Sequence, residues 1–534
     1  MKLNRRHLLG GGAALGAAGL GLAPAAPAFA APIGTDLVTV RPEDPRYGDL
    51  ITPFNQRWVG HPELVRLPTT TAQVVRAVQD AVSAGKRVTV RGGGHGYEDF
   101  IYNSEVQVVI DMNLMNTVSY DPGRRAFAVE AGATLSDVYN TLYQGWGVTV
   151  PGGVCANVGT GGHVSGGGYG MLSRKHGLVV DHLYGVEVVT VDRSGRARAV
   201  VATREARDAN RELWWAHAGG GGGNFGVITR YFFRTPGASG HDPASLLPRP
   251  PKEVLVTTAA WSWDDVTEDG FARLLHAYGQ WHETNQDPAS PNAGLCCWLF
   301  LPHRCAGSIS LLLQMDATPP DANNRVERFL ALLDGAVGAR NTHTTMRMPW
   351  LKATRHMGTS SELQNSPTFR GEHKSAYLRR AFPDRQIAAI WRHLNRADYA
   401  NAFGMLVATS YGGRVNTVAP HETAVAQRSV ILKLLYQTYW KDPTEDAANV
   451  AWLREFYRDV YADTGGVPVP NDVTDGCYIN YPDSDISDPA WNVSAAPWHE
   501  LYYKGNYARL QRVKAAWDPG NVFRHRQSIR LPGA

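Results

Sequence analysis

Hydrophobic and polar positions in the first part of the chain alternate between helical and strand spacing. Thr70 is predicted to be the N-cap of a helix, and Gln73 three residues later completes a capping box. Gly85 ends this helix, and three valines form its predicted apolar stripe: Val75, Val78 and Val82. A β-branched strand at 87–91 runs directly into a glycine turn. This unit is expected to present His95 to a ligand at the end of the strand.

The same mixed pattern continues up to a Pro- and Gly-rich break at 235–251. Before the break, strands are predicted at 106–111, 126–129 and 186–191, and a helix at 133–142. Beyond it, the strands become longer and alternate: 308–315, 402–410 and 429–439. Helices lie between them, and one keeps four apolar residues on one face: Val326, Phe329, Leu330 and Leu333. This pattern is typical of an α+β domain whose antiparallel sheet is covered on one side.

The last segment, 477–534, returns to mixed character. It contains the tetrapeptide Tyr478-Ile479-Asn480-Tyr481, a predicted helix at 506–517 and a stop at Asp518-Pro519-Gly520-Asn521. Nothing here marks an independent domain, so we expect this segment to pack back on the first one. The predicted fold class is therefore α+β.

The stretch 150–169, VPGGVCANVGTGGHVSGGGY, carries the strongest chemical signal. It contains eight glycines, one cysteine, one histidine and one tyrosine. Glycine permits positive φ and close approach of backbone amides, so such runs favour a ligand held by the main chain. A flexible linker is the alternative, but linkers rarely interleave Cys, His and Tyr with glycine. The turn VRGGGHGY at 90–97 is the predicted partner of this stretch.

A third glycine cluster, GGGGGNFG at 219–226, contains a formal GxGxxG match at Gly221, Gly223 and Gly226. The match is weak evidence for a Rossmann nucleotide fold. No predicted strand leads into it, and no acidic residue follows about twenty positions on. The chain also contains no GxxxxGK[ST] phosphate loop.

The first thirty residues are predicted to be an export signal. Arg5-Arg6 precede an apolar run, and Ala28-Phe29-Ala30 supplies a small-x-small cleavage site. The paired arginines indicate the twin-arginine route, which carries folded proteins, and a retained membrane anchor is the lesser alternative. Removing three basic residues leaves 50 Lys and Arg against 49 acids, a charge of +1. This balance argues against a nucleic-acid or membrane-surface partner.

Five cysteines occur, without zinc-site spacing, and no metal site is predicted. In an exported protein Cys296 or Cys297 is a candidate disulfide partner of Cys305, and free buried cysteine is the alternative, also for Cys477. Cys155 differs because it lies inside the glycine framework.

Five motifs occur in order across nearly the whole chain that follows the signal: RGGGHGY, PGGVCANVGTGGHVSGGGYG, GGGGGNFGVIT, YINYPD and YYKGNYARLQRVKAAWDPGNVFRHRQSI. Together they resemble the berberine-bridge-enzyme-like branch of the vanillyl-alcohol-oxidase flavoprotein family, in particular its secreted bacterial antibiotic-tailoring and sugar oxidases. The resemblance implies FAD bonded twice, through His95 to the flavin 8α-methyl carbon and through Cys155 to ring carbon 6. Imidazole and thiolate are nucleophiles able to attack an electron-poor flavin ring.

The resemblance also implies the other cofactor contacts. Backbone amides of 91–94 and 158–162 would cradle the pyrophosphate. Val158 falls where the family controls oxygen access, and valine there favours an oxidase. The complete implied cofactor-binding set is Arg91, Gly92, Gly93, Gly94, His95, Cys155, Val158, Gly159, Thr160, Gly162, His163, Gly168, Tyr169, Gly226, Val227, Tyr478, Asn480 and Asn521.

In family terms Tyr478 is the main candidate for the catalytic base, with Tyr169 as its neighbour. Tyrosine ionises near pH ~10, so positive charge or hydrogen bonds must stabilise its phenolate, and Lys433 or Arg414 is the candidate source of charge. Tyr481 is the rival base. If both tyrosines lie on a strand, three residues apart, they are expected to face differently. The weaker substrate-pocket candidates are Tyr377 and Tyr411.

These observations predict a secreted FAD oxidase that acts on a sugar, an oligosaccharide or a glycosylated natural product and produces H2O2. The alternatives are a flavin-dependent oxidative cyclase or dehydrogenase, and a secreted carbohydrate-binding protein. The expected partners are that substrate and O2, with no nucleic acid, no membrane after signal cleavage and a monomeric state. The signal peptide is predicted at 1–30. The resemblance implies a PCMH-type FAD-binding domain at 31–237 that 477–534 completes, and a substrate domain with a large antiparallel sheet at 238–476.

Overall fold

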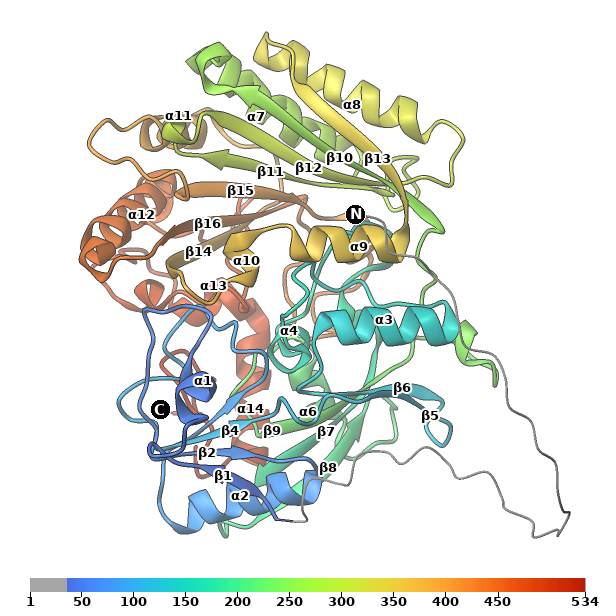
Figure 1. Ribbon diagram of the computed structural model, residues 1–534, viewed down its shortest axis with the longest axis vertical. Helices are drawn as coiled ribbons and strands as arrows, with labels where there is room; N and C mark the ends of the chain where they lie inside the picture. Colours follow the sequence, from blue (N-terminus) through green and yellow to red (C-terminus); the bar gives the residue numbers. More distant parts are fainter. Residues whose placement is uncertain (1–35, 534) are drawn as a thin grey trace, which may run out of the picture. The chain divides into compact units, whose positions relative to one another are not determined.

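Three β-sheets organise residues 36–533, which are the residues described by the computed structural model (Figure 1). The expected signal peptide lies outside these residues. A four-stranded sheet has the order β1-β2-β4-β3, in which β2 and β3 run parallel to β4 and β1 is antiparallel to β2. Its strands are β1 Val38–Val40, β2 Leu64–Leu67, β3 Val88–Arg91 and β4 Val108–Asp111.

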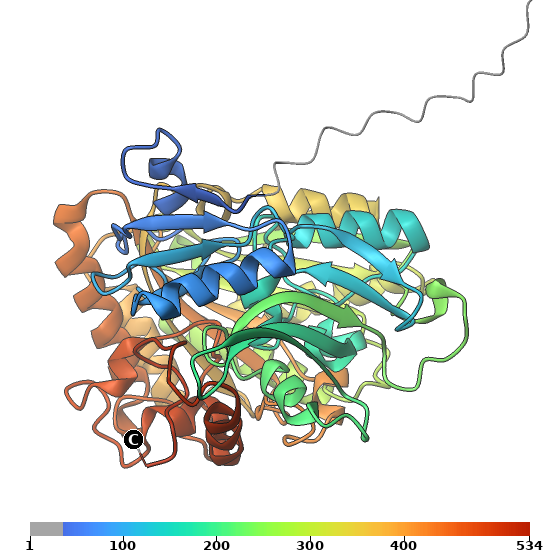
Figure 2. The same ribbon diagram turned by 90° about the horizontal axis from the view of Figure 1, so that it is seen from below.

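The second sheet has five antiparallel strands in the order β5-β6-β9-β7-β8. These are β5 Val118–Asp121, β6 Ala126–Glu130, β7 Leu183–Val191, β8 Ala197–Thr203 and β9 Val227–Phe233. The helices in this half are α1 Tyr47–Ile51, α2 Thr71–Ser83, α3 Leu135–Trp146, α4 Thr160–Ser165, α5 Ser173–His176 and α6 Arg211–His217. Helix α2 packs between the two sheets, where it touches β4 and β7–β9 (Figure 2).

The predicted helix at Thr70 is confirmed, with two differences. The Thr70 hydroxyl accepts from the Gln73 N–H, but the Gln73 side chain bonds the N–H of Thr69, so the expected reciprocal box does not form. The buried face is also turned by about one residue from the predicted stripe. It consists of Val74, Ala77, Val78 and Ala81, because α2 is covered by sheets on two sides.

The third sheet is the predicted large antiparallel one, with seven strands in the order β13-β10-β12-β11-β15-β16-β14. The strands are β10 Glu253–Ser262, β11 Leu295–Pro302, β12 Ser308–Asp316, β13 Thr342–Pro349, β14 Arg370–Leu378, β15 Met405–Ser410 and β16 Leu432–Trp440. The accompanying helices are α7 Glu268–Thr284, α8 Ala322–Val337, α9 Trp350–Thr359, α10 Glu362–Asn365, α11 Asp384–Leu394 and α12 Asp446–Val460.

Strand β16 shows how this sheet separates a helical layer from a cavity. Tyr436 points to α12, where its ring meets Phe456 edge-on. Leu435 and Gln437, one position away on either side, line a cavity on the opposite face. The two-residue period of a strand produces this division, and Tyr436 and Gln437 are buried while Leu435 is partly buried.

The C-terminal segment contains α13 Trp498–Tyr503 and α14 Tyr507–Trp517, and α14 packs on α6 (Figure 2). The Asn224 side chain accepts from the N–H of Ile529, and Lys514 donates to the carbonyl of Asn224. The segment thus contacts the glycine cluster at 219–226. Among residues 36–533, no helix has the length and apolar character needed to cross a bilayer.

All five cysteines are free thiols, so the candidate disulfide to Cys305 does not form. Cys296, Cys297 and Cys477 are buried, as the alternative anticipated, whereas Cys305 is exposed.

Candidate active site

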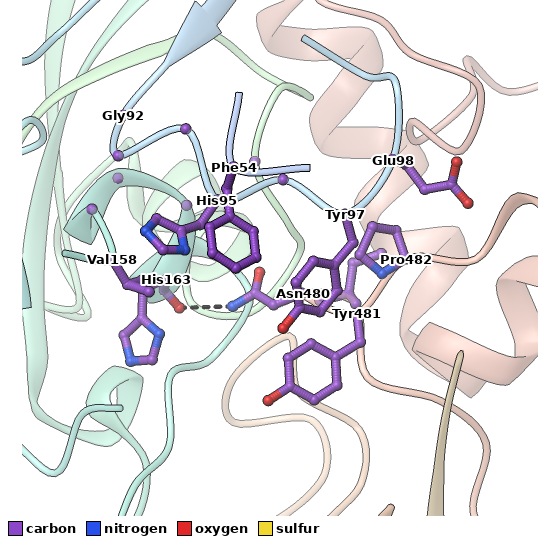
Figure 3. A pocket seen from close by; sticks show the side chains of 18 of the residues that line it. Phe54, Gly92, His95, Tyr97, Glu98, Val158, His163, Asn480, Tyr481 and Pro482 are labelled. Atoms are coloured by element: carbon purple, nitrogen blue, oxygen red, sulfur yellow. Dashed lines mark hydrogen bonds between the residues drawn. The ribbon is translucent and has the colours of Figure 1, made fainter. Parts of the chain in front are cut away.

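A cavity of about 480 Å³ is lined by the glycine segments and by strands of the seven-stranded sheet. Figure 3 shows the side formed by His95, Val158 and His163 together with Asn480 and Tyr481. This volume is within the range of pockets for small molecules and cofactors. Its lining comes from widely separated parts of the chain, chiefly Phe54, 88–101, 153–163, 221–228, strands β11, β15 and β16, 478–482 and 523–525, with Tyr169, Ser361 and Leu363 among the others. Segments separated by more than 300 residues therefore form one site.

The two main glycine segments meet backbone to backbone at the cavity. A Cβ on Gly159 would overlap the backbone nitrogen of Gly93, and a Cβ on Gly93 would overlap that of Gly159. Only glycine permits this approach. At Gly162, by contrast, a Cβ would meet nothing within 4 Å, because the backbone there faces open space in the cavity. The paired loops thus form a surface of backbone atoms that a ligand can approach closely.

His95 lies in the loop after β3, and its ring stacks on Phe54 with 4.6 Å between centroids. Burial, assisted by the charge of Arg91, lowers the pKa of His95 to about 4. The imidazole is therefore neutral at pH 7, which is its nucleophilic form. Arg91 itself pairs with Asp111 at 2.8 Å and does not line the cavity.

Cys155 lines the same cavity from the second glycine segment. Burial raises the pKa of its thiol to about 12. Its sulfur is therefore protonated at pH 7 and must lose a proton before it can act as a nucleophile.

Three tyrosine rings surround the ammonium group of Lys433 on β16. Lys433 Nζ lies 3.3 Å from the ring centroid of Tyr169, 3.5 Å from that of Tyr478 and 3.9 Å from that of Tyr481. This nitrogen is buried and has no hydrogen-bond partner among the described residues. Burial lowers the pKa of Lys433 well below its usual value and raises the pKa of all three tyrosines. We call these four residues the tyrosine–lysine cluster.

Tyr478 and Tyr481 do not lie on a strand, so the expectation that they face differently is wrong. They belong to a turn in which the N–H of Tyr481 bonds the carbonyl of Tyr478, and their rings meet edge-on at 5.1 Å. Their hydroxyl groups have different hydrogen-bond partners. That of Tyr481 bonds the hydroxyl of Tyr169 at 2.7 Å, whereas the oxygen of Tyr478 accepts from the Gly168 N–H and the Asn480 side chain.

Strand β14 holds this turn in place. Ser375 Oγ accepts from the N–H of Tyr478 at 3.0 Å. Two residues beyond Tyr481, the buried carboxylate of Asp483 pairs with Lys374 at 2.8 Å, and Asp485 pairs with the same amine at 2.7 Å. The lysine thus compensates a carboxylate cluster that Glu372 completes.

Most of the residues predicted from the sequence line the cavity: Gly92, Gly93, Gly94, His95, Cys155, Val158, Gly159, Gly162, His163, Tyr169, Gly226, Tyr478, Asn480 and Tyr481. Lys433 lies behind the tyrosines. Others named by the resemblance do not line it: Arg91, Thr160, Gly168, Val227 and Asn521. Thr160 bonds the carbonyl of Glu130, and the backbone turns at Asn521, so that Phe523–His525 reach the cavity instead.

The two weaker substrate-pocket candidates and Arg414, the alternative source of charge, also lie away from the cavity. Tyr377 and Tyr411 are buried in a second layer behind the tyrosine–lysine cluster, with 5.4 Å between their centroids. Arg414 is exposed, so Lys433 is the cation that the structure places beside the tyrosines.

The sequence reasoning missed two groups of lining residues. The first is on the sheet: Trp298, Phe300, Met405, Val407, Thr409, Leu435, Gln437 and Tyr439. Their alternation along β11, β15 and β16 was the available signal. The second is at the other end, where His525 stacks on Phe100 at 4.1 Å and burial raises the pKa of Glu98 to about 7. No local pattern marks this second group.

The residues present fit the predicted FAD. A backbone surface without side chains, a neutral imidazole and a thiol all face one cavity. These are the groups that the predicted attachment requires.

Comparisons with known proteins agree with this site. A family model described as an FAD binding domain matches residues 62–198, and one described as berberine and berberine like matches 477–530. Aclacinomycin-N/aclacinomycin-A oxidase of Streptomyces galilaeus is 49% identical over 100% of this chain and 99% of its own. The crystal structure of aclacinomycin oxidoreductase has a TM-score of 0.90 and 49% identity, over 93% of this chain and 100% of that one.

A glycopeptide hexose oxidase complexed with teicoplanin has a TM-score of 0.87 and 46% identity, over 93% of this chain and 99% of that chain. The matches confirm the predicted fold class, with a PCMH-type FAD-binding fold and a large antiparallel sheet.

Proposed function

Because this chain belongs to the berberine-bridge-enzyme-like family of FAD-linked oxidoreductases, we propose that it binds FAD covalently at both His95 and Cys155. We further propose that it oxidises a hydroxyl group of a bulky sugar, oligosaccharide or glycosylated natural product. One observation carries this proposal. His95 and Cys155 are sixty residues apart in the chain, yet both line a single cavity that is also lined by glycine backbone.

The two attachments differ in their chemistry. The neutral imidazole of His95 is ready to form a bond at pH 7, whereas the thiol of Cys155 must first give up its proton. Two tethers would hold the flavin in a site too open to grip it by burial alone.

Tyr478 is the proposed base that takes the proton from the substrate hydroxyl. When bound, FAD supplies the hydride acceptor, and its reoxidation by O2 releases hydrogen peroxide. When it is protonated, Lys433 stabilises the phenolate of Tyr478, because its Nζ lies 3.5 Å from the centroid of that ring. Tyr481 is less suited to this role because its hydroxyl is bonded to that of Tyr169.

The sheet side of the cavity supports a bulky substrate. Five apolar side chains of β11, β15 and β16 face the cavity: Trp298, Phe300, Met405, Val407 and Leu435. Thr409 and Gln437 add polar groups among them. A free monosaccharide leaves most of this apolar surface uncovered, whereas a sugar joined to an apolar body covers it. The names of the similar proteins, which mention aclacinomycin and teicoplanin, support this choice.

Two further features complete the proposal. Val158 lines the cavity, and the family resemblance implies that valine at this position favours a direct reaction with oxygen. The signal sequence at 1–30 supports export by the twin-arginine route after the cofactor has been loaded. We retain the domain boundaries given above and a monomeric state.

The experiment combines attachment and turnover. Acid-precipitated protein should remain yellow, and a peptide map should show modified His95 and Cys155. A peroxide-coupled screen should then find a substrate among glycosylated metabolites and oligosaccharides. Colourless precipitate with both residues unmodified would contradict covalent binding, and substrate oxidation without peroxide would favour the cyclase or dehydrogenase.

A further inference from the structure

The oxygen of Tyr478 accepts two hydrogen bonds from nitrogen donors. Asn480 Nδ2 lies 3.0 Å away and the backbone nitrogen of Gly168 lies 3.2 Å away. The other two tyrosines of the cluster have no such pair, because their hydroxyl groups bond each other. Two N–H donors aimed at one oxygen stabilise that oxygen most strongly when it is negatively charged.

The Asn480 donor is fixed in orientation. Its Nδ2 also donates to the carbonyl of His163 at 2.9 Å, which is the dashed line in Figure 3. An amide oxygen turned toward that carbonyl would be repelled, so the nitrogen must face both acceptors. The side chain rests on Gly166, where a Cβ would overlap Asn480 Oδ1.

The Gly168 donor is fixed by backbone conformation. Gly168 has φ of +68°, and a Cβ there would lie 2.8 Å from Val179 and 2.9 Å from His163. Its carbonyl is already bonded to the N–H of Val179 at 2.9 Å. Neither Gly166 nor Gly168 lines the cavity, and both glycines are therefore assigned to the placement of Asn480 and Tyr478.

We propose that Asn480 and the backbone N–H of Gly168 form a two-donor pocket for the deprotonated oxygen of Tyr478. Asn480 is then a positioning residue for the base, in addition to lining the cavity. This inference rests on the proposed function, in which Tyr478 is the base.

None of the titratable side chains that face Tyr478 among the described residues is a carboxylate, so no negative charge opposes ionisation of its phenol. The titratable side chains that face it are Lys433 from β16, Tyr377 from β14 and four tyrosines from loops: Tyr97, Tyr169, Tyr411 and Tyr481. His163, beyond Asn480, is neutral because burial lowers its pKa to about 4. Lys433 acts on the ring face, whereas the two donors act on the oxygen.

The test compares the holoenzyme with Asn480→Leu and Asn480→Asp. Loss of the donor raises the pKa of the Tyr478 phenol. The acidic limb of the pH profile of kcat/KM should therefore move to higher pH by about 1–2 pH units in Asn480→Leu. At a pH below the limb, kcat/KM should fall about tenfold for each pH unit that the limb moves. Ionised aspartate adds a negative charge beside the phenolate, so Asn480→Asp should move the limb further. The matched control is Asn210→Leu, which removes an asparagine side chain that donates to the carbonyl of Val201 and does not line the cavity, and it should leave the limb in place.

A second readout does not depend on turnover. Fluorotyrosine placed at position 478 reports the ionisation of that ring by ¹⁹F NMR, and its titration should move upward in Asn480→Leu by the same amount. Unchanged titration and an unmoved limb in Asn480→Leu would overturn the inference. If Tyr478→Phe is inactive in that case, the proposed base stands and only the donor pocket is wrong. Full activity of Tyr478→Phe would instead overturn the base and with it this inference.

Discussion

The cavity has two walls of different construction. The glycine wall, formed by 92–96 and 153–163, offers main chain together with two reactive side chains, His95 and Cys155. The sheet wall, formed by β11, β15 and β16, offers mostly apolar side chains. A wall of main chain can hold a group that is always the same, whereas a wall of side chains can be changed one residue at a time. In the proposed function, the glycine wall binds the cofactor and the sheet wall selects the substrate.

The largest effect is expected from removing both nucleophiles of the glycine wall. His95→Ala should leave flavin attached through Cys155 alone, and His95→Ala combined with Cys155→Ala should abolish covalent flavin. The measurement is absorbance of the acid-precipitated protein, followed by mass determination. Covalent FAD in the double variant would mean that the attachment residues lie elsewhere.

Tyr478, where the two walls meet, should give the next largest effect. Tyr478→Phe removes the proton acceptor, so kcat should fall by about 10²–10⁴-fold while the flavin spectrum stays nearly intact. Stopped-flow measurement of flavin reduction checks this directly. Tyr481→Phe is the comparison variant, and a larger loss there than in Tyr478→Phe would transfer the role of base to Tyr481.

Close contact within the glycine wall should appear as a stability effect. Gly159→Ala adds a methyl group that overlaps Gly93, and such overpacking is expected to reduce the free energy of unfolding by about 1–3 kcal/mol. Chemical denaturation of the holoenzyme measures it. Gly145→Ala in helix α3, where a Cβ meets nothing within 4 Å, is the matched control and should be neutral or slightly stabilising. Equal losses in the two variants would argue against close loop contact.

The smallest effect, and the one specific to the sheet wall, is expected from Trp298→Ala. This change should lower kcat/KM about tenfold for a glycosylated aromatic substrate, with little change for a free sugar and none in flavin attachment. Leu332→Ala, an exposed apolar residue on α8 away from the cavity, is the control. The same loss for both kinds of substrate would remove the distinction between the walls.

Local patterns were sufficient for much of the fold. The Thr70 cap, the strand that ends at Arg91 and the long strands after the break are all present, although β15 and β16 begin three residues later than predicted. The apolar face of α2 was displaced by a residue, because which valine is buried depends on the two sheets that cover the helix.

The residues of the glycine wall could be identified from short segments of the chain. Glycine runs with an interleaved histidine and cysteine are rare in flexible linkers and favour ligand binding. The family resemblance and the ligand-binding backbone were therefore both predicted from local motifs. The difference between Tyr478 and Tyr481 emerged only from the folded chain. Their roles depend on hydrogen bonds to Gly168, Asn480 and Tyr169, and two of these three residues are more than 300 positions away in the chain. Hydrogen-bond direction depends on how distant segments pack, and a local pattern does not contain that information.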